Sequence, residues 1–378
     1  MTTADLVIGA NYGDEGKGTI TARLALQHRH QKVINVLSNG GSQRGHSVTL
    51  INKRHTFKHF GSGTPFGVVS YFPKEFIINP LQFCKEWKKL VNELHFQIPR
   101  CVRHWRCRWS TPYDMMWNQI SCQLQWKGTC GMGIWSTICR YYEMPSIPSF
   151  DAFSSVYNIE QQIKFLKDVR FYYETKGLDI PFDYLDAWKS DTLIDNFIKD
   201  CQLMFEKTLS VDDIDFTQFD HAIFENGQGM LLTDNFTDDP ERTPSCTDSR
   251  ILWNFKNQFK DVTVHYVTRP YITRHGSDIF QEEKVDADID KSIEINQYNQ
   301  WQHKFKYAPL DINILQENIL NDACRTSPKY NMHYAIDVTH CDELDRSSEF
   351  KKVFDNRLIG YPGDLTLNFY GSPIIDSE

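Results

Sequence analysis

A chain of 378 residues, 40% of them hydrophobic, can bury a large core in one large α/β domain or in two smaller ones. The net charge of −8 at pH 7 argues against nucleic acid as a main partner, because binding to DNA or RNA needs a basic surface. The chain has no membrane-length apolar run and no secretory signal pattern, so we expect a soluble, cytoplasmic protein that binds no membrane.

The cysteines are expected to be reduced thiols, because a long chain without a signal peptide usually stays in a reducing compartment. The segment 101–107, with Cys101, His104 and Cys107, suggests a zinc site at first sight. It lacks the closely spaced cysteine pair of a zinc knuckle, so we expect no metal there.

The order of the predicted elements indicates a parallel sheet. Residues 4–9 and 32–38 have the composition of buried strands, and residues 17–28 between them have helical periodicity, which together make a βαβ unit. Helical patterns follow at 80–96 and at 157–207, the second interrupted at 177–181, and strands are predicted at 223–224, 262–267 and 335–339. The acidic segments 208–220 and 278–295 are expected to be surface connections.

A glycine-rich turn follows the first predicted strand and carries the strongest chemical signal. Glycines let the backbone approach a phosphate closely, and Lys17 and Thr19 can contact a phosphate and Mg²⁺. Six residues separate Gly9 from Gly16, whereas the usual phosphate loop has four, which argues against a plain NTPase. Asp14 would repel phosphates unless it binds a metal ion or takes up a proton.

Residues 13–19 (GDEGKGT) resemble the opening signature of the adenylosuccinate synthetase family, and further segments resemble other motifs of that family in the same order. The resemblance implies an α/β fold with a mostly parallel central sheet flanked by helices. It implies a single domain over 1–378, with a helical excursion at about 80–210. It also implies a ligase that joins L-aspartate to the 6-position of IMP through a 6-phosphoryl intermediate, driven by cleavage of a nucleoside triphosphate.

The resemblance assigns catalytic roles to two residues. Asp14 is implied to be both a Mg²⁺ ligand and the base that removes the purine N1 proton, without which the 6-oxo group is a poor nucleophile. His46 is implied to donate to the oxygen that bridges the purine and the γ-phosphate. The carbonyl of Gly45 is implied to bind Mg²⁺ as well, and Glu15 is expected to be structural or to add charge at the helix start. The implied triphosphate contacts are residues of the turn: Gly13, Gly16, Lys17, Gly18 and Thr19.

The implied contacts of the purine monophosphate come from distant segments: Gln43, Thr129, Arg140, Gln228, Thr247 and Arg274. Arg140 stands near the arginine that the family lends across a dimer interface, and a homodimer is therefore the implied assembly. The chain departs from the family pattern at several positions, since Arg44 replaces a small alanine and Met132 replaces an arginine.

The remaining implied contacts belong to the other two substrates. Thr339 and Asp342 occupy the segment that reads guanine in the family, which favours GTP over ATP as the phosphate donor. Lys304 and Lys306 stand where the family has a run of arginines for L-aspartate. Lysine lacks the two-pronged arginine fork, so the identity of the amino acid stays open.

Two alternatives stay open. The monophosphate could be GMP or deoxy-GMP, giving a 2-amino product as in phage enzymes that build diaminopurine, and the many departures fit a divergent viral member acting in a host cytoplasm. The other alternative is a nucleotide-binding regulatory protein without catalysis. The joint presence of Asp14, Lys17, His46 and Gln228 argues against it, because a binder needs neither base nor acid.

Overall fold

The computed structural model describes residues 2–125, 129–144, 159–177, 179–233, 243–255, 258–276, 280–287, 289, 294, 298–299, 301, 303–326, 330–355, 363–371 and 374–375. Part of the segment 127–133, which contains Thr129 and Met132, and part of the acidic segment 278–295 lie outside these residues. None of the described helices is long and apolar enough to cross a membrane.

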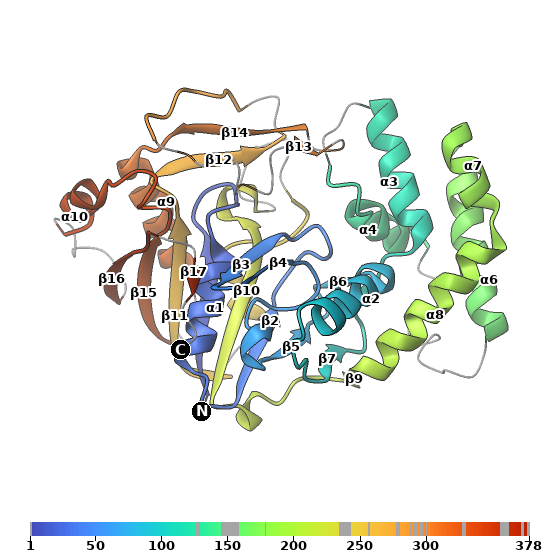
Figure 1. The fold of residues 1–378 in the computed structure, drawn as a ribbon, viewed down its shortest axis with the longest axis horizontal. Coiled ribbons are helices and arrows are strands. Elements are labelled where there is room, and N and C mark those ends of the chain that lie inside the picture. Colours follow the sequence, from blue (N-terminus) through green and yellow to red (C-terminus); the bar gives the residue numbers. More distant parts are fainter. Residues whose placement is uncertain are drawn as a thin grey trace.

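A nine-stranded sheet forms the centre of the molecule (Figure 1). Its strands are β1 (Thr2–Gly9), β2 (Val33–Leu37), β5 (Val69–Phe72), β7 (Cys101–His104), β9 (Thr208–Val211), β10 (His221–Gly229), β11 (Phe259–Thr268), β15 (Asn331–Val338) and β16 (Asp364–Phe369). They lie in the order β16-β15-β11-β1-β10-β2-β5-β7-β9, and every pairing is parallel. The predicted parallel sheet is confirmed.

Strand β1 occupies the middle of this sheet because its apolar residues are continuous. Only Thr3 is exposed among its eight residues, and Ala4 lies in register between Ala222 of β10 and Val262 of β11. A strand that is covered on both faces needs apolar side chains at successive positions, since these alternate between the faces. The glycine-rich turn therefore begins at the centre of the carboxyl edge.

Smaller sheets surround the carboxyl edge of the large one. Their strands are β3 (His46–Leu50), β4 (Lys53–Phe57), β6 (Ile77–Ile78), β8 (Arg108–Trp109), β12 (Tyr271–His275), β13 (Tyr298–Asn299), β14 (His303–Pro309) and β17 (Ile374–Ile375). Strands β12, β14 and β13 form one antiparallel sheet, and β3 pairs with both β4 and β17.

Helices cover both faces of the large sheet. They are α1 (Lys17–Gln27), α2 (Pro80–Lys88), α3 (Pro112–Gln125), α4 (Ile134–Glu143), α6 (Ile159–Glu174), α7 (Phe182–Lys189), α8 (Asp191–Lys207), α9 (Ile312–Arg325) and α10 (Ser347–Asp355). Val7 of β1 packs against Ile20 of α1 on one face. Leu6, on the other face, belongs to the core cluster of Leu315 in α9 and Phe350 in α10. Helices on both faces complete the predicted α/β architecture.

Helices α2 to α8 gather beside the edge of the sheet that carries β7 and β9 (Figure 1). Phe83 of α2, Val169 of α6 and Phe197 of α8 belong to one buried cluster. The helices predicted within 157–207 are confirmed, with the break where it was expected. The helix predicted over 80–96 is shorter, because α2 ends at Lys88 and a π-helical turn continues to Glu93.

The predicted surface connection 208–220 is partly a strand. Its first four residues form β9, an edge strand that pairs parallel with β7, so that part of the prediction was wrong.

The cysteine-containing segment 101–107 supplies β7, and Sγ of Cys107 donates to the carbonyl of Phe72. No disulfide joins the ten cysteines, all of which lie in the described part of the chain.

Candidate active site

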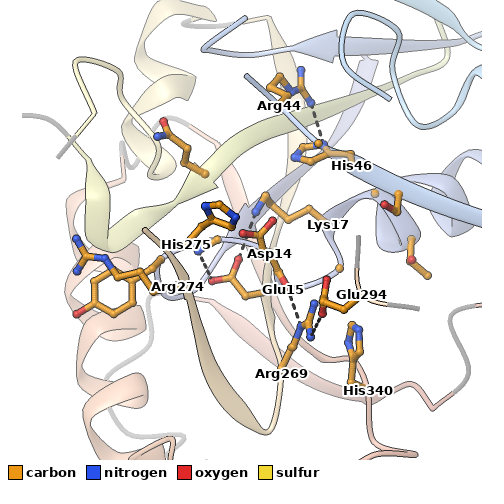
Figure 2. Close-up of a pocket in the computed structure, with 18 of the residues that line it drawn as sticks. Asp14, Glu15, Lys17, Arg44, His46, Arg269, Arg274, His275, Glu294 and His340 are labelled. Atoms are coloured by element: carbon orange, nitrogen blue, oxygen red, sulfur yellow. Dashed lines mark hydrogen bonds and ion pairs between the residues drawn. The ribbon is translucent and has the colours of Figure 1, made fainter. Parts of the chain in front are cut away.

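A cavity lies at the carboxyl edge of β1, β2, β10 and β11 (Figure 2). Loops that follow neighbouring parallel strands meet at one edge of a sheet, which is why segments far apart in sequence converge here. Eleven residues predicted for the site line it: Gly13, Asp14, Gly16, Lys17, Gly18, Thr19, Gln43, Gly45, His46, Gln228 and Arg274.

The glycine-rich turn is held from inside by the buried carboxylate of Glu15. Its Oε1 accepts hydrogen bonds from the backbone N–H groups of Asn11 and Gly13 at 2.9 and 3.0 Å, and its Oε2 lies 3.3 Å from Nζ of Lys17. The negative charge of Glu15 would normally disfavour phosphate binding, but its carboxylate oxygens already accept from the backbone of the turn and from Lys17. Glu15 therefore shapes the loop, in agreement with the structural role expected for it.

Helix α1 starts directly from this turn without a side-chain cap. Gly16, at its N-cap, has a φ of 94°, which favours glycine. A Cβ atom on Gly18 would come within 3.0 Å of His46, so the helix start and the histidine lie in close contact. An anion can take the place of the absent cap, because the first N–H groups of a helix lack intrahelical acceptors.

Asp14 lies at the tip of the turn in a left-handed conformation, with a φ of 61°. Nε of Arg269 donates to its carbonyl oxygen at 2.8 Å, and the hydroxyl of Thr273 donates to the carbonyl of Gly13 at 3.0 Å. These two bonds fix the backbone where isolated chains rarely place it. Burial raises the pKa of the Asp14 carboxyl to about 6, against the nearby positive charge of Lys17. Such a carboxyl can exchange a proton near neutral pH.

His46 is oriented by a buried carboxylate on the neighbouring strand. Its Nδ1 lies 2.5 Å from Oε1 of Glu225, which also accepts from the hydroxyl of Ser62. A carboxylate only accepts, so Nδ1 carries the proton and Nε2 is left for another partner. Burial and the adjacent Arg44 lower the pKa of His46 to about 4. The imidazole is therefore neutral until an anion enters.

Arg44 adds a second cation beside this pair. Its Nη2 lies 3.4 Å from Oε1 of Glu225. The same atom lies 3.1 Å from Nδ1 of His46 (Figure 2). Both Arg44 and Glu225 are buried, and their opposite charges compensate one another. The arginine thus occupies the position where the family pattern has a small residue.

Three polar side chains of the cavity have buried atoms without a hydrogen-bond partner among the described residues. They are Oε1 of Gln43, Nη1 of Arg44 and Oε1 of Gln228. Buried polar atoms are nearly always paired, so such a concentration in one cavity indicates that a polar ligand completes them. Gln228, the second-last residue of β10, also has a left-handed φ of 63°.

Several residues of the cavity were missed by the sequence analysis: Arg54, Arg269, Glu294, His340 and Glu343. Arg269 is the most connected of them, since its Nη1 donates to Glu294 at 2.9 Å and to the hydroxyl of Tyr271 at 3.1 Å. The signal available for Arg269 was its place two residues after the predicted strand 262–267, at the carboxyl edge. Arg274 lies over the ring of Tyr12, with 4.4 Å from the guanidinium carbon to the ring centroid.

Three predicted monophosphate contacts lie outside the cavity. The hydroxyl of Thr129 donates to Oδ1 of Asn118 at 2.9 Å, and that of Thr247 donates to the carbonyl of Gly229 at 2.8 Å. Arg140 is buried, and its Nε and Nη2 donate to the two oxygens of Asp114 at 2.8 and 2.9 Å. This geometry gives Arg140 a structural function between α3 and α4 and does not favour its prediction as a dimer contact.

The residues predicted for the triphosphate base and for aspartate also lie beside the cavity rather than in it. The hydroxyl of Thr339 donates to the carbonyl of Glu15 at 2.7 Å and thereby supports the turn. Asp342 and Lys304 are exposed, and Nζ of Lys306 donates to the carbonyl of Phe280 at 3.1 Å. None of the four lines the cavity.

The donors available for a divalent cation are hard oxygens. The carboxylate of Asp14 and the carbonyl of Gly45 line the same cavity, while Glu15 is committed to backbone N–H groups and Lys17. Mg²⁺ is usually held by one or two carboxylates or carbonyls together with substrate phosphates. The two residues therefore fit the Mg²⁺ ligands that the sequence predicts.

Comparisons with known proteins agree with this architecture. Residues 6–305 match the family model for adenylosuccinate synthetase. The adenylosuccinate synthetase of Chlorobium limicola is 25% identical over 75% of this chain and 65% of its own length. The chain thus spans just under two thirds of that relative. The synthetase of Buchnera aphidicola is 25% identical over 93% of this chain and 80% of its own.

Two solved structures share the fold. The fully ligated adenylosuccinate synthetase of Plasmodium falciparum has a TM-score of 0.61 at 17% identity, over 89% of this chain and 77% of that one. The succinoaminodeoxyadenylate synthetase of cyanophage S-2L, bound to dGMP and to dATP as an energy donor, has a TM-score of 0.61 at 11% identity. That match covers 99% of this chain and 93% of the phage enzyme.

Proposed function

We propose that this chain, which belongs to the adenylosuccinate synthetase family, is a ligase that joins L-aspartate to the 6-position of a purine nucleoside monophosphate at the expense of a nucleoside triphosphate. One observation carries the proposal. Asp14 and His46 line the same cavity as the glycine-rich turn. Asp14 is a carboxyl group with a pKa of about 6, and His46 is an imidazole that a buried carboxylate holds in place. A base, an acid and a phosphate-binding turn in one cavity suit phosphoryl transfer to the 6-oxygen of a purine whose N1–H is weakly acidic.

Each of these groups has a separate task in the reaction. Asp14 removes the proton from N1 of the purine, so that electron density moves to the 6-oxygen, which attacks the γ-phosphorus and displaces the nucleoside diphosphate. Lys17 and the N-terminus of α1 bind the oxygens of the transferred phosphoryl group. The amine of aspartate then attacks C6, and the 6-oxygen leaves with the phosphate.

Glu225 and His46 act together in the transfer. The bond from Nδ1 of His46 to Glu225 fixes the tautomer and directs Nε2 toward a ligand. Arrival of an anionic phosphoryl group raises the proton affinity of the buried imidazole, which can then donate at the bridging oxygen. Mg²⁺, held by Asp14 and Gly45, would supply positive charge to the phosphate oxygens.

IMP is the monophosphate we assign, with GTP as donor, and a cytoplasmic homodimer is the assembly we propose. A guanine monophosphate is the second candidate. The phage neighbour of the same fold is bound to dGMP and to dATP as an energy donor, and a carboxylate at Asp14 could accept from both N1–H and the 2-amino group of guanine. The non-catalytic alternative is not favoured, because Asp14 and His46 face one cavity.

The test is phosphate release by purified protein with Mg²⁺, in a complete mixture and in mixtures that each omit one substrate. IMP, GMP and deoxy-GMP are crossed with GTP and ATP, and the purine absorbance is followed in parallel. We expect release only when triphosphate, monophosphate and L-aspartate are all present. Release that does not depend on the monophosphate and aspartate, or no release in any mixture, would contradict the ligase proposal.

A further inference from the structure

A second cluster of ionisable side chains lies at the other end of α1 from the phosphate-type turn. Asp5 is on β1, His221 begins β10 and His28 follows the last residue of α1. The strand register sets His221 beside Thr3, so its side chain reaches the face of the sheet that α1 covers, where Asp5 also lies. The cluster is the one group of three or more potential metal ligands found among the described residues.

The donor atoms converge on a single point. Nε2 of His221 lies 2.8 Å and Nε2 of His28 lies 3.9 Å from the same oxygen, Oδ2 of Asp5, and each of the three residues offers a ligand atom within 4.8 Å of the other two. Donors that surround zinc tetrahedrally at about 2.0–2.1 Å are roughly 3.3–3.5 Å apart. The two distances lie on either side of that value. The rings of His28 and His221 are stacked, with centroids 3.9 Å apart and an angle of 17° between their planes, so binding of one ion by both Nε2 atoms requires the half-buried His28 ring to rotate.

The other ring nitrogens are held as they are in metal sites. Nδ1 of His28 lies 3.2 Å from Oε1 of Gln31, and Nδ1 of His221 lies 2.7 Å from the hydroxyl of Thr3. An amide oxygen only accepts, so Nδ1 of a neutral His28 carries the proton and its Nε2 keeps a lone pair. Metal-binding histidines usually donate their other N–H in this way.

The neighbouring His265 contacts Oδ1 of Asp5, so it does not compete with a cation for Oδ2 of the same carboxylate. Nε2 of His265 lies 3.5 Å from Oδ1, the other oxygen of Asp5, while Nδ1 of His265 lies 2.7 Å from Oδ2 of Asp337. Both ring nitrogens of His265 face carboxylate oxygens, which only accept, so His265 donates to the two aspartates and is not a ligand. A small cavity lined by Gln27, Asp261 and Thr263 adjoins the cluster and leaves room for a water as fourth ligand.

We propose that Asp5, His28 and His221 form a binding site for Zn²⁺ or a similar borderline divalent cation, separate from the candidate active site. Two imidazole nitrogens and one carboxylate oxygen form a donor set that suits zinc and is unlike the all-oxygen sets of Mg²⁺ and Ca²⁺. The site joins β1, β10 and the end of α1, so bound metal would stabilise the packing of that end of α1 against the two strands. This inference does not depend on the proposed activity.

The test is zinc titration of tag-free, chelator-stripped protein against a competing chromogenic chelator. Asp14→Asn serves as the background, because Asp14 could itself bind zinc, and His28→Gln is made within it. His30→Gln is the matched control, since His30 is exposed and lies two residues away. We expect one zinc per chain, affinity at least ~10-fold weaker in His28→Gln and unchanged in His30→Gln, and about 10-fold weaker binding in Gln31→Leu.

Two further readouts distinguish a specific metal site from nonspecific zinc binding. Zinc should raise the melting temperature of the background and of His30→Gln but not of His28→Gln, because a ligand that binds only the folded state stabilises it. X-ray absorption should show nitrogen ligands at about 2.0–2.1 Å. Absence of stoichiometric binding in the Asp14→Asn background, or equal affinity in His28→Gln and His30→Gln, would overturn the proposal.

Discussion

Asp14 combines an unusual backbone conformation with a buried carboxyl group, and both features serve a single task in the proposed mechanism. The left-handed φ of 61° points the residue into the cavity, and the bond from Arg269 holds its carbonyl there. Burial keeps the proton affinity of the carboxyl high enough for a base that works near neutral pH. A residue kept for folding alone would not need either feature.

Replacing Asp14 by asparagine should therefore remove turnover and leave the fold intact. We expect kcat to fall by about 10³-fold or more, because general-base catalysis alone contributes about 10²–10⁴-fold. The melting temperature should be unchanged or higher, because the raised pKa means that the buried charged form opposes folding at pH 7. Steady-state kinetics and thermal unfolding check this, with the exposed Asp212→Asn as control. Retention of wild-type kcat would exclude Asp14 as the base.

The buried pair of Arg44 and Glu225 allows a second test at the same scale. Glu225→Gln leaves the Arg44 guanidinium buried without its carboxylate, which typically costs about 3–5 kcal/mol of unfolding free energy. Adding Arg44→Ala removes the unpaired charge, so the double variant should recover part of that loss in urea unfolding. It should not recover kcat, because His46 still lacks the group that orients it. A double variant less stable than Glu225→Gln would mean that the two charges are not coupled.

At the scale of elements, a buried ion pair between Asp114 and Arg140 joins α3 and α4. The family resemblance had assigned Arg140 to a substrate contact across a dimer interface. Asp114 accepts from Arg140 and also from the backbone N–H of Thr111 at 2.7 Å and the hydroxyl of Tyr173 at 2.6 Å. The two accounts of Arg140, a structural partner and a substrate contact across a dimer, predict different measurements.

Arg140→Leu distinguishes these accounts. We expect a loss of about 3–5 kcal/mol in unfolding free energy, because an unpaired carboxylate would remain between the helices. The KM for the monophosphate, measured on the folded fraction, should change little. Asp114→Asn should cause a comparable loss of stability. A large rise in KM with unchanged stability would favour the contact across a dimer.

Strands β1, β11 and β15 are linked by Asp5, His265 and Asp337, and this link should make stability depend on pH. The folded pKa of His265 is raised from about 6.5 to about 10. A raised pKa means that its contribution is complete below pH 6.5 and is lost as the pH rises toward 10. Urea unfolding between pH 6.5 and 9 with a chelator present should show a steeper decline for wild type than for His265→Gln. Parallel declines would contradict this.

The central elements were predictable because their signals are local and strong. Continuous apolar residues identified β1, and helical periodicity with a break at Gly177 identified the helices around it. The hairpin β3–β4, the edge strand β9 and its neighbour β7 were not predicted, because they are short and mix polar with apolar residues. Their pairing is decided by tertiary contacts such as Cys101 with Thr208.

For the whole molecule, the sequence located the part of the site that one loop supplies and was less informative about the rest. The turn residues that were predicted for the site all line the cavity, since their relative positions are fixed by a few bonds of backbone. Arg140, Thr247 and Lys304 were assigned by resemblance across divergent segments, and the fold places them outside it. Arg269 and Glu294 were missed because they are 25 residues apart in sequence and their side chains meet only in the folded chain.

The most direct test of the central claim follows the 6-oxygen of the purine. In the proposed reaction this oxygen attacks the γ-phosphorus and leaves with the phosphate when the amine of aspartate takes its place. The monophosphate that supports turnover is labelled with ¹⁸O at the 6-position and incubated with triphosphate, L-aspartate and Mg²⁺. Mass spectrometry should find one ¹⁸O in each phosphate released. Unlabelled phosphate would show that water attacks the triphosphate and would contradict the ligase account.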